Sequence, residues 1–181
     1  EVQQCCADWI EGLQEIAGRR TGNEPLLLLF LGSSIGNLER GGIIDFLRHL
    51  HSNLRPGDFF LVGADFIKDI DTMMTAYDDP TGVTAAFNLN VLARINRELE
   101  ADFDLRSFAH EVRWNSEERR IEMHLLSGRN QAAYIGALDT TFKFGAGETI
   151  CTEFSHKFTP SELLSYCLLY TSDAADDLTR V

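Results

Sequence analysis

Glu153 and Ser155 place a carboxylate and a hydroxyl two positions apart in the segment TEFSHKF, residues 152–158. A carboxylate accepts hydrogen bonds, and a hydroxyl donates or accepts them, so the pair could hold a polar ligand. We expect the segment to be a β-strand, in which residues two apart point to the same side. The alternative is a solvated strand face, because Lys157 and Cys151 would share that side.

Asn37 and Tyr77 offer an amide N–H and a phenol O–H, two neutral donors suited to a carboxylate. Gly32 and Asn37 begin and end the segment GSSIGN, directly after an apolar run. Ligands of open α/β sheets bind at the carboxyl ends of the strands, so this segment is a candidate site. A tight turn with Asn37 as a helix N-cap, and a surface tyrosine beside the turn at Asp78–Pro80, are the alternatives.

The first third of the chain predicts a strand, a helix and a second strand. The apolar runs Leu26–Leu31 and Phe59–Ala64 are typical of strands covered on both faces of a parallel sheet. A helix is expected between them, over about Arg40–Leu54, which makes a right-handed βαβ unit. Upstream, Asp8 is expected to cap a short helix, with Glu11 three residues later.

The rest of the chain predicts one longer helix and an antiparallel meander. The helix should run from about Gly82 to Leu99, with Phe87, Val91 and Leu92 on its apolar stripe. Alternation then places Ile121, Met123 and Leu125 on one face of a strand. The other predicted strands are Phe108–Trp114, Gln131–Ala137, Thr140–Phe144 and Thr149–Phe158, followed by a helix start at Thr159–Glu162.

Composition excludes several classes of partner and site. A net charge of −12 over 181 residues argues against nucleic acid and anionic membranes, which need basic patches. No apolar run reaches the roughly 18 residues of a membrane span. No signal sequence is recognisable, so we expect a cytoplasmic protein whose four cysteines are free thiols. The five histidines have no ligand spacing, so no metal is expected.

Three segments in the same order carry a family resemblance: LFLGSSIGN, YDDPTGVTAAFNLNVLARINRELEADF and TEFSHKF. Together they resemble the S-adenosylmethionine-dependent histidine Nα-methyltransferases of ergothioneine biosynthesis, over about Asp8 to Phe158. The resemblance implies an α/β fold, with part of a class I (Rossmann-like) sheet in residues 1–66. A substrate-binding domain of one helix and an antiparallel sheet would occupy residues 67–158. The implied reaction moves methyl groups from S-adenosylmethionine to the α-amine of L-histidine, giving hercynine.

The resemblance also implies roles for individual residues, none of them catalytic in the chemical sense. Asn37 and Tyr77 would grip the substrate carboxylate. Glu153 would accept an imidazole N–H, with the Ser155 hydroxyl on the other ring nitrogen. The residues expected to line the pocket around the substrate, with plain core packing as their alternative, are Phe87 and Met123.

For the methyl donor, the resemblance implies three contacts near the start of the chain. The Asp8 carboxylate would accept from the adenine amine, the Trp9 ring would pack on the base, and Gly32 would approach the cofactor closely. A helix N-cap followed by a core aromatic is the alternative for Asp8 and Trp9.

Both ends suggest an incomplete protein. Residues 159–166 would begin a helix, and residues 167–181, which begin CLLYTSDAADD, resemble the translation of a sequencing adaptor and would be a non-native tail. The family's glycine-rich cofactor loop would lie before Glu1 and its last strands after the end. We therefore expect an inactive piece of an enzyme that is a monomer when complete. An N-methyltransferase of another amino acid and a non-catalytic amino-acid-binding module remain the alternatives.

Overall fold

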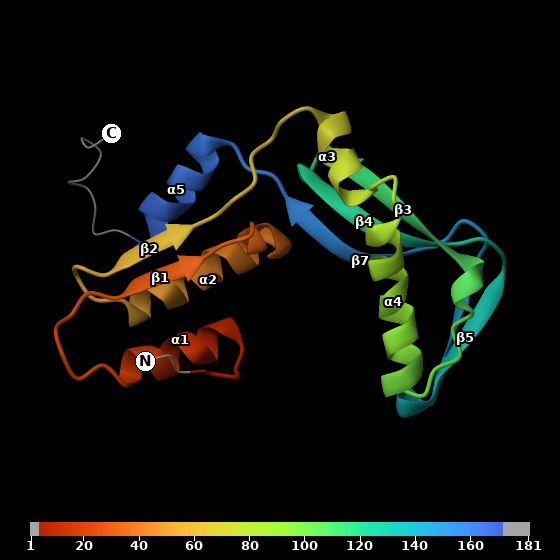
Figure 1. The fold of residues 1–181 in the computed structure, drawn as a ribbon, viewed down its shortest axis with the longest axis horizontal. Helices are drawn as coiled ribbons and strands as arrows, with labels where there is room; N and C mark the ends of the chain where they lie inside the picture. The colour runs from red at the N-terminus through yellow and green to blue at the C-terminus, as the bar shows by residue number, and fades with distance from the viewer. Residues whose placement is uncertain (1–3, 172–181) are drawn as a thin grey trace. The chain divides into compact units, whose positions relative to one another are not determined.

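The computed structural model describes residues 4–171, which form two compact units (Figure 1). One unit comprises the described parts of Glu1–Phe66 and Phe158–Val181, and the other is Ile67–Lys157. Both combine helices with β-strands, so the chain is a mixed α/β protein.

The first unit is built on two parallel strands, as predicted. Strand β1 (Leu27–Phe30) pairs with β2 (Phe59–Val62), and helix α2 (Arg40–Asn53) connects them. The predicted bounds of this helix are confirmed to within a residue. Its buried side chains pack on Phe30 and Leu28 of β1 and on Phe60 and Val62 of β2, because residues four apart lie on one side of a helix. These core residues are Ile43, Phe46, Leu47 and Leu50.

Two further helices complete this unit. Helix α1 (Trp9–Gly18) begins as predicted, with the Glu11 backbone N–H donating to the Asp8 side chain at 2.9 Å. Helix α5 (Pro160–Thr171) packs on α2, and Arg40 pairs with Glu162 at 2.6 Å. Helix α5 thus extends past the expected start at residues 159–166 into the segment 167–181, whose last residues, 172–181, lie outside the described part of the chain.

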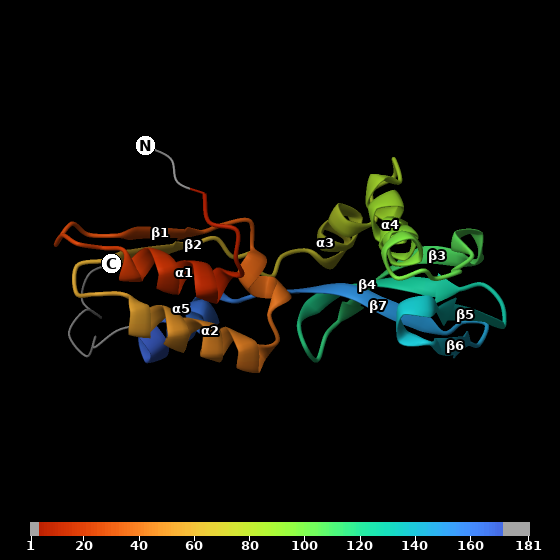
Figure 2. The same ribbon diagram turned by 90° about the horizontal axis from the view of Figure 1, so that it is seen from below.

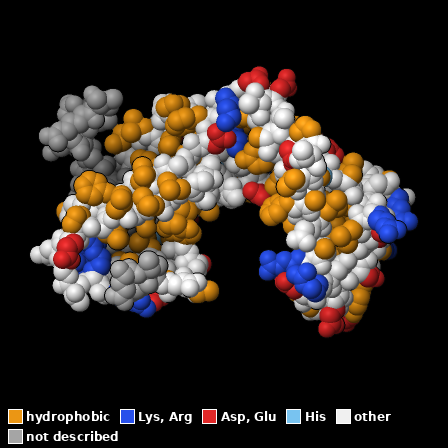
Figure 3. Space-filling view, in the orientation of Figure 1, with side chains coloured by type: hydrophobic (Ala, Val, Ile, Leu, Met, Phe, Trp, Pro, Cys, Tyr) orange, Lys and Arg blue, Asp and Glu red, His pale blue; other side chains and the backbone are white. Residues whose placement is uncertain are grey.

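The prediction that both strands are covered on both faces is wrong. Figure 2 shows helices α1, α2 and α5 on one side of β1 and β2. The side chains on the other side are exposed, by 59% for Leu27 and 62% for Phe59. Leu29 and Leu61 lie between them on the same face, and Figure 3 shows hydrophobic side chains gathered over these strands. We call these four residues the open sheet face.

The second unit contains two antiparallel sheets where one meander was expected. Strands β3 (Phe108–Asn115), β4 (Arg120–Ser127) and β7 (Thr149–His156) form one sheet in the order β3-β4-β7. Strands β5 (Gln131–Ile135) and β6 (Thr140–Phe144) form a separate hairpin. The single meander is wrong because the Ser127 N–H donates to the Glu148 carbonyl at 2.8 Å, which joins β4 directly to β7.

Helices α3 (Ile70–Tyr77) and α4 (Val83–Glu98) lie on one side of the three-stranded sheet (Figure 2). Helix α3 was not predicted. Tyr77 is therefore the last residue of a helix rather than part of a turn. Helix α4 agrees with the predicted span, with Gly82 at its N-cap in a left-handed conformation (φ 76°) that glycine adopts without strain.

The predicted apolar stripe of α4 is wrong at its first position. Phe87 is 64% exposed, whereas Asn88 beside it is 1% exposed and faces the sheet together with Leu92. An asparagine is buried there because polar groups of the sheet lie beneath it and need hydrogen-bond partners.

A β-bulge in β7 changes which residues share a face. Met123 pairs with Glu153, but the next residue, His124, pairs with Cys151, so Thr152 is the extra residue. Directly opposed residues of antiparallel strands share a face. Cys151 therefore lies on the face opposite to Glu153, and the prediction that the two share a side is wrong because strict alternation ends at the bulge.

None of the helices within residues 4–171 has the length and the apolar character needed to cross a lipid bilayer.

Candidate functional site

The helix-covered face of the three-stranded sheet brings together Tyr77, Ser155 and Lys157. Tyr77 ends α3, Ser155 lies in β7, and Lys157 follows that strand. The Lys157 Nζ donates to the Tyr77 hydroxyl oxygen at 2.7 Å and to Ser155 Oγ at 3.0 Å. Ser155 and Lys157 are both buried, so this polar group is enclosed by protein.

Glu153 and Met123 belong to the same face, because they pair across β7 and β4 and Ser155 is two residues beyond Glu153. Met123 is buried and Glu153 is partly buried. The predicted inward alternation of Ile121, Met123 and Leu125 is confirmed, since all three are buried. The face thus combines a carboxylate, two hydroxyls and an ammonium with apolar side chains, a composition suited to one polar ligand.

Asn88 ties helix α4 to all three strands. Its Nδ2 donates to the His124 carbonyl at 3.1 Å and lies 2.9 Å from His110 Nδ1. Its Oδ1 lies 2.6 Å from the Thr152 hydroxyl, which also lies 3.1 Å from the Met123 carbonyl oxygen. His110 Nε2 lies 2.9 Å from the Tyr77 carbonyl, so the same chain of contacts reaches the end of α3. These contacts fix the helix and the bulge in place.

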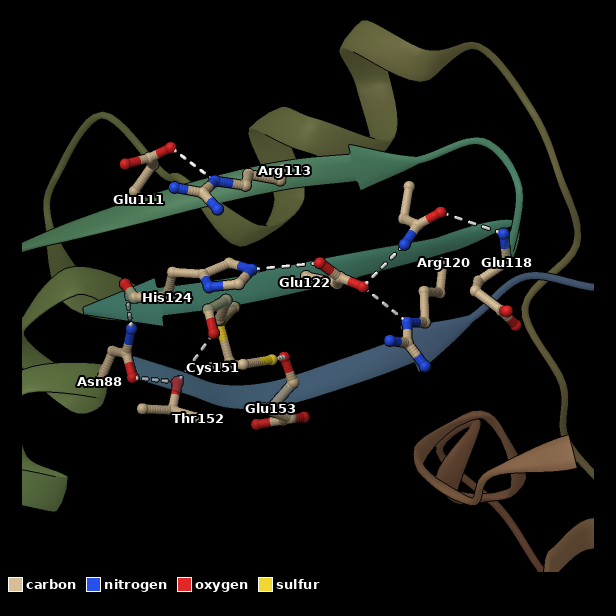
Figure 4. A network of polar contacts seen from close by, with 12 residues as sticks. Asn88, Glu111, Arg113, Glu118, Arg120, Glu122, His124, Cys151, Thr152 and Glu153 are labelled. Carbon is tan, nitrogen blue, oxygen red and sulfur yellow. Dashed lines mark hydrogen bonds and ion pairs between the residues drawn. The ribbon is translucent and has the colours of Figure 1, made fainter. Parts of the chain in front are cut away.

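The opposite face of the same sheet carries further polar contacts, which connect through His124 to Asn88 and Thr152 (Figure 4). Glu122 accepts from Arg120 Nε at 2.7 Å and from Asn115 Nδ2 at 3.0 Å, and lies 3.1 Å from His124 Nε2. Burial raises the pKa of the Glu122 carboxyl, but the hydrogen bonds from Arg120, Asn115 and His124 outweigh it and lower that pKa to about 2. The Arg120 guanidinium also covers the ring of Phe154, with 4.5 Å from Cζ to the ring centroid.

In the first unit, the carboxyl ends of β1 and β2 are held together. Gly32 and Ser33 both adopt left-handed conformations, with φ of 76° and 60°, and turn the chain directly after β1. The Ser33 hydroxyl oxygen accepts from the Asp65 N–H at 2.9 Å, which joins this turn to the segment after β2.

Asn37 is exposed at the end of the short helix η1 (Ser34–Asn37), in the unit that does not contain Tyr77. It does not cap helix α2, whose N-cap is Glu39. The two residues of the predicted carboxylate clamp thus belong to different units, and the clamp stays a prediction.

Asp8 and Trp9 line a hollow of about 370 Å³ together with residues of α1 and β1. The Asp8 side chain caps α1, which confirms the N-cap half of the alternative, but Trp9 is 44% exposed and is not a core residue. The Trp9 ring packs edge-on against Phe30 with 4.6 Å between centroids. At this hollow, a carboxylate that accepts hydrogen bonds lies beside an indole ring that can pack on a flat group. Gly32 is not part of this lining.

Among residues 4–171, no group of three or more His, Cys, Asp or Glu side chains is placed to hold a metal ion.

Sequence reasoning missed Lys157 as a site residue and used it only as a sign of a solvated strand face. The signal was its place in the run FSHKF, where a lysine stands between aromatic residues. His110 was also missed, because a single histidine in a strand has no distinctive spacing.

Comparison with known proteins identifies the family. The family described as histidine-specific methyltransferase, SAM-dependent, matches residues 1–173. The histidine N-alpha-methyltransferase of Mycobacterium tuberculosis is 52% identical over 162 residues, 88% of this chain and 49% of the relative. That of Mycolicibacterium smegmatis is 47% identical over 167 residues, 91% of this chain and 50% of the relative.

A more distant relative, the ergothioneine biosynthesis protein 1 of Schizosaccharomyces pombe, is 30% identical over 145 residues, 80% of this chain and 18% of the relative. The chain spans about half the length of the two mycobacterial relatives it matches. Since the family match covers nearly every residue, the chain belongs to the histidine-specific, S-adenosylmethionine-dependent methyltransferases.

Proposed function

We propose that the protein to which this chain belongs transfers methyl groups from S-adenosylmethionine to the α-amine of L-histidine, in ergothioneine synthesis. The observation that carries the proposal is the enclosed group of Ser155, Lys157 and Tyr77 beside Glu153 and Met123. The names of the relatives, histidine N-alpha-methyltransferase and ergothioneine biosynthesis protein 1, support the substrate and the pathway.

The substrate ring would lie between Glu153 and Ser155, packed on Met123, with Phe87 as a further lining residue. The Glu153 carboxylate would accept one ring N–H, and the Ser155 hydroxyl would contact the other ring nitrogen. A site built in this way rejects side chains that leave its buried polar groups without partners.

Asn37 and Tyr77 would hold the substrate carboxylate. Two neutral donors on one carboxylate fix both the position and the direction of the adjacent amine. The methyl donor supplies an electrophilic carbon on its sulfonium, and the protein contributes by aligning the amine with that carbon. No side chain needs to act as a nucleophile.

We propose Asp8, Trp9 and Gly32 as contacts of the methyl donor, with the first unit as part of a Rossmann-like sheet. The parallel β1–α2–β2 arrangement and the hollow at Asp8 and Trp9 support this. The complete enzyme would be a cytoplasmic monomer that needs no metal.

Methylation of histidine by the full-length protein tests the proposal. Mass spectrometry should detect successive additions of one methyl group to histidine and none to histamine, which lacks the carboxylate. Asn37→Ala and Tyr77→Phe should slow turnover and reduce the preference for histidine. Equal methylation of histamine and histidine by the wild type would refute the predicted carboxylate clamp. Methylation of another amino acid alone would favour the alternative of an N-methyltransferase for that amino acid.

A further inference from the structure

The Lys157 side chain contacts two residues of the proposed histidine site without being assigned a role in it. It is 1% exposed, and lysine is rarely buried to this extent. Its Nζ donates to the Tyr77 hydroxyl oxygen at 2.7 Å and to Ser155 Oγ at 3.0 Å, and lies 4.7 Å from the centroid of the Tyr77 ring. One ammonium therefore bridges helix α3 and strand β7.

An ammonium has donors and no acceptor, so it fixes the direction of each hydrogen bond that it makes. A hydroxyl whose oxygen accepts from Lys157 still has its own O–H to donate. Each hydrogen bond from Lys157 occupies one lone pair of the hydroxyl oxygen and turns its O–H away from the ammonium, which favours donation by Tyr77 and Ser155 to a third group. Without the lysine, either hydroxyl could rotate and accept from a ligand instead.

We propose that Lys157 is a positioning residue that sets Tyr77 and Ser155 as hydrogen-bond donors to the amino-acid ligand. This inference rests on the proposed function. It explains how the site would distinguish ligands by polarity as well as by shape. Tyr77 would donate to a carboxylate, and Ser155 would donate to a ring nitrogen that has a free lone pair.

The consequence for histidine is that the site takes the neutral imidazole. The Ser155 hydroxyl would require a ring nitrogen without a proton, while the Glu153 carboxylate would accept from the ring nitrogen that carries one. An imidazolium, or a ring whose only nitrogen is a donor, leaves Ser155 without an acceptor. Unmatched buried polar groups are the strongest source of discrimination between similar ligands.

Calorimetric affinities of the full-length protein for three kinds of ligand test this inference. The ligands are histidine, histamine, and the two alanine derivatives that carry a pyrrol-2-yl or pyrrol-3-yl ring, whose only nitrogen donates. We expect the wild type to bind histidine at least tenfold more tightly than either pyrrole compound or histamine. In Lys157→Met, the preference for histidine over the pyrrole compounds and the preference for histidine over histamine should both fall to about threefold or less.

The matched control is Lys143→Met, because Lys143 is an exposed lysine on β6 of the same unit. It should keep both preferences. Lys157→Gln keeps N–H donors but adds a carbonyl acceptor, and it should give intermediate ratios. S-adenosylhomocysteine affinity and the thermal midpoint report whether each variant is folded.

Should the Lys157 variants fail to fold, Ser155→Ala tests the donor role that the inference assigns to Ser155. If Ser155 is a fixed donor, its removal should abolish the preference for histidine over the pyrrole compounds. A folded Lys157→Met that keeps both wild-type ratios, or a Ser155→Ala that keeps the ring preference, would overturn the inference. A wild type that does not bind histidine would overturn the proposed function, which is a separate result.

Discussion

At the scale of single residues, the structure places two of the predicted substrate contacts in different environments. Ser155 is buried and held by Lys157, whereas Glu153 is only partly buried and lies opposite Met123 across the strands. The two residues share one face of β7 because both follow the bulge at Thr152. A ligand between them would meet a carboxylate and a hydroxyl at once.

We predict that Glu153→Ala and Ser155→Ala weaken histidine binding far more than cofactor binding. Loss of one buried, charge-assisted hydrogen bond should cost about 1.5–3 kcal/mol of binding free energy. Calorimetry on the full-length protein measures both affinities. Unchanged histidine affinity in both variants would refute the assignment of these residues.

At the scale of elements, Asn88 makes the contact between helix α4 and the sheet specific. The helix span was predictable from its apolar period, but its orientation was not. Periodicity predicted Phe87 in the core, while three hydrogen-bonding groups of β3, β4 and β7 draw Asn88 inward instead. These hydrogen-bonding groups belong to residues that are distant from Asn88 in the sequence, so no local sequence pattern indicates that Asn88 is buried.

The β-bulge in β7 also could not be predicted from the local sequence. Strand β7 and its start at Thr149 were predictable from the sequence, although it ends at His156 rather than at the predicted Phe158. The extra residue Thr152 is selected by its contacts to Asn88 and the Met123 carbonyl. Strict alternation therefore placed Glu153 and Ser155 together correctly and Cys151 wrongly. The run FSHKF marks Lys157 as unusual, but its contact with Tyr77 could not be predicted because the two residues are far apart in the chain.

We predict that Asn88→Ala destabilises the protein by about 1–3 kcal/mol, because it leaves buried polar groups of the sheet without a partner. Urea unfolding measures the change. Asn90→Ala is the matched control, since Asn90 is an exposed asparagine on the same helix. Equal effects of the two changes would show that Asn88 does not connect the helix to the sheet.

Glu122, on the opposite face of the sheet, should make the stability of the protein depend on pH in the acidic range. Its pKa of about 2 in the folded protein is below the value of about 4.3 expected for an unfolded glutamate. The contribution of the Glu122 carboxylate to the free energy of unfolding is therefore complete above about pH 4.3 and is lost as the pH falls toward 2. Solvent screening limits it to about 1 kcal/mol.

Urea unfolding of Glu122→Gln and of wild type at pH 6 and pH 3 checks this. The stability difference between them should shrink at pH 3, and Glu117→Gln, at an exposed glutamate in the adjacent turn, should show no such trend. A difference that is the same at both pH values would exclude a role of the Glu122 charge.

At the scale of the whole molecule, the described part of the chain holds two units, and the sheet of the first unit has one open face. The open sheet face consists of Leu27, Leu29, Phe59 and Leu61. Contiguous exposed apolar side chains on a sheet favour association. The relatives are about twice as long as the matched region, so further chain is available in them to cover such a face.

We predict that the 181-residue chain alone associates in solution and transfers no methyl group, because alignment of amine and methyl donor needs both sites intact. Size-exclusion chromatography and a labelled-methyl assay check the two parts. Leu29→Lys with Phe59→Lys should reduce association without restoring activity. A monomeric, active 181-residue chain would show that the methyl-donor site is contained within it.

Calorimetric titration of the full-length protein with histidine, with and without saturating S-adenosylhomocysteine, tests the proposed histidine site most directly. We predict saturable binding of histidine in the presence of S-adenosylhomocysteine, because different residues make the proposed amino-acid and methyl-donor contacts. Binding should weaken sharply in Ser155→Ala. An absence of histidine binding under both conditions, or tighter binding of another amino acid, would contradict the proposed histidine site.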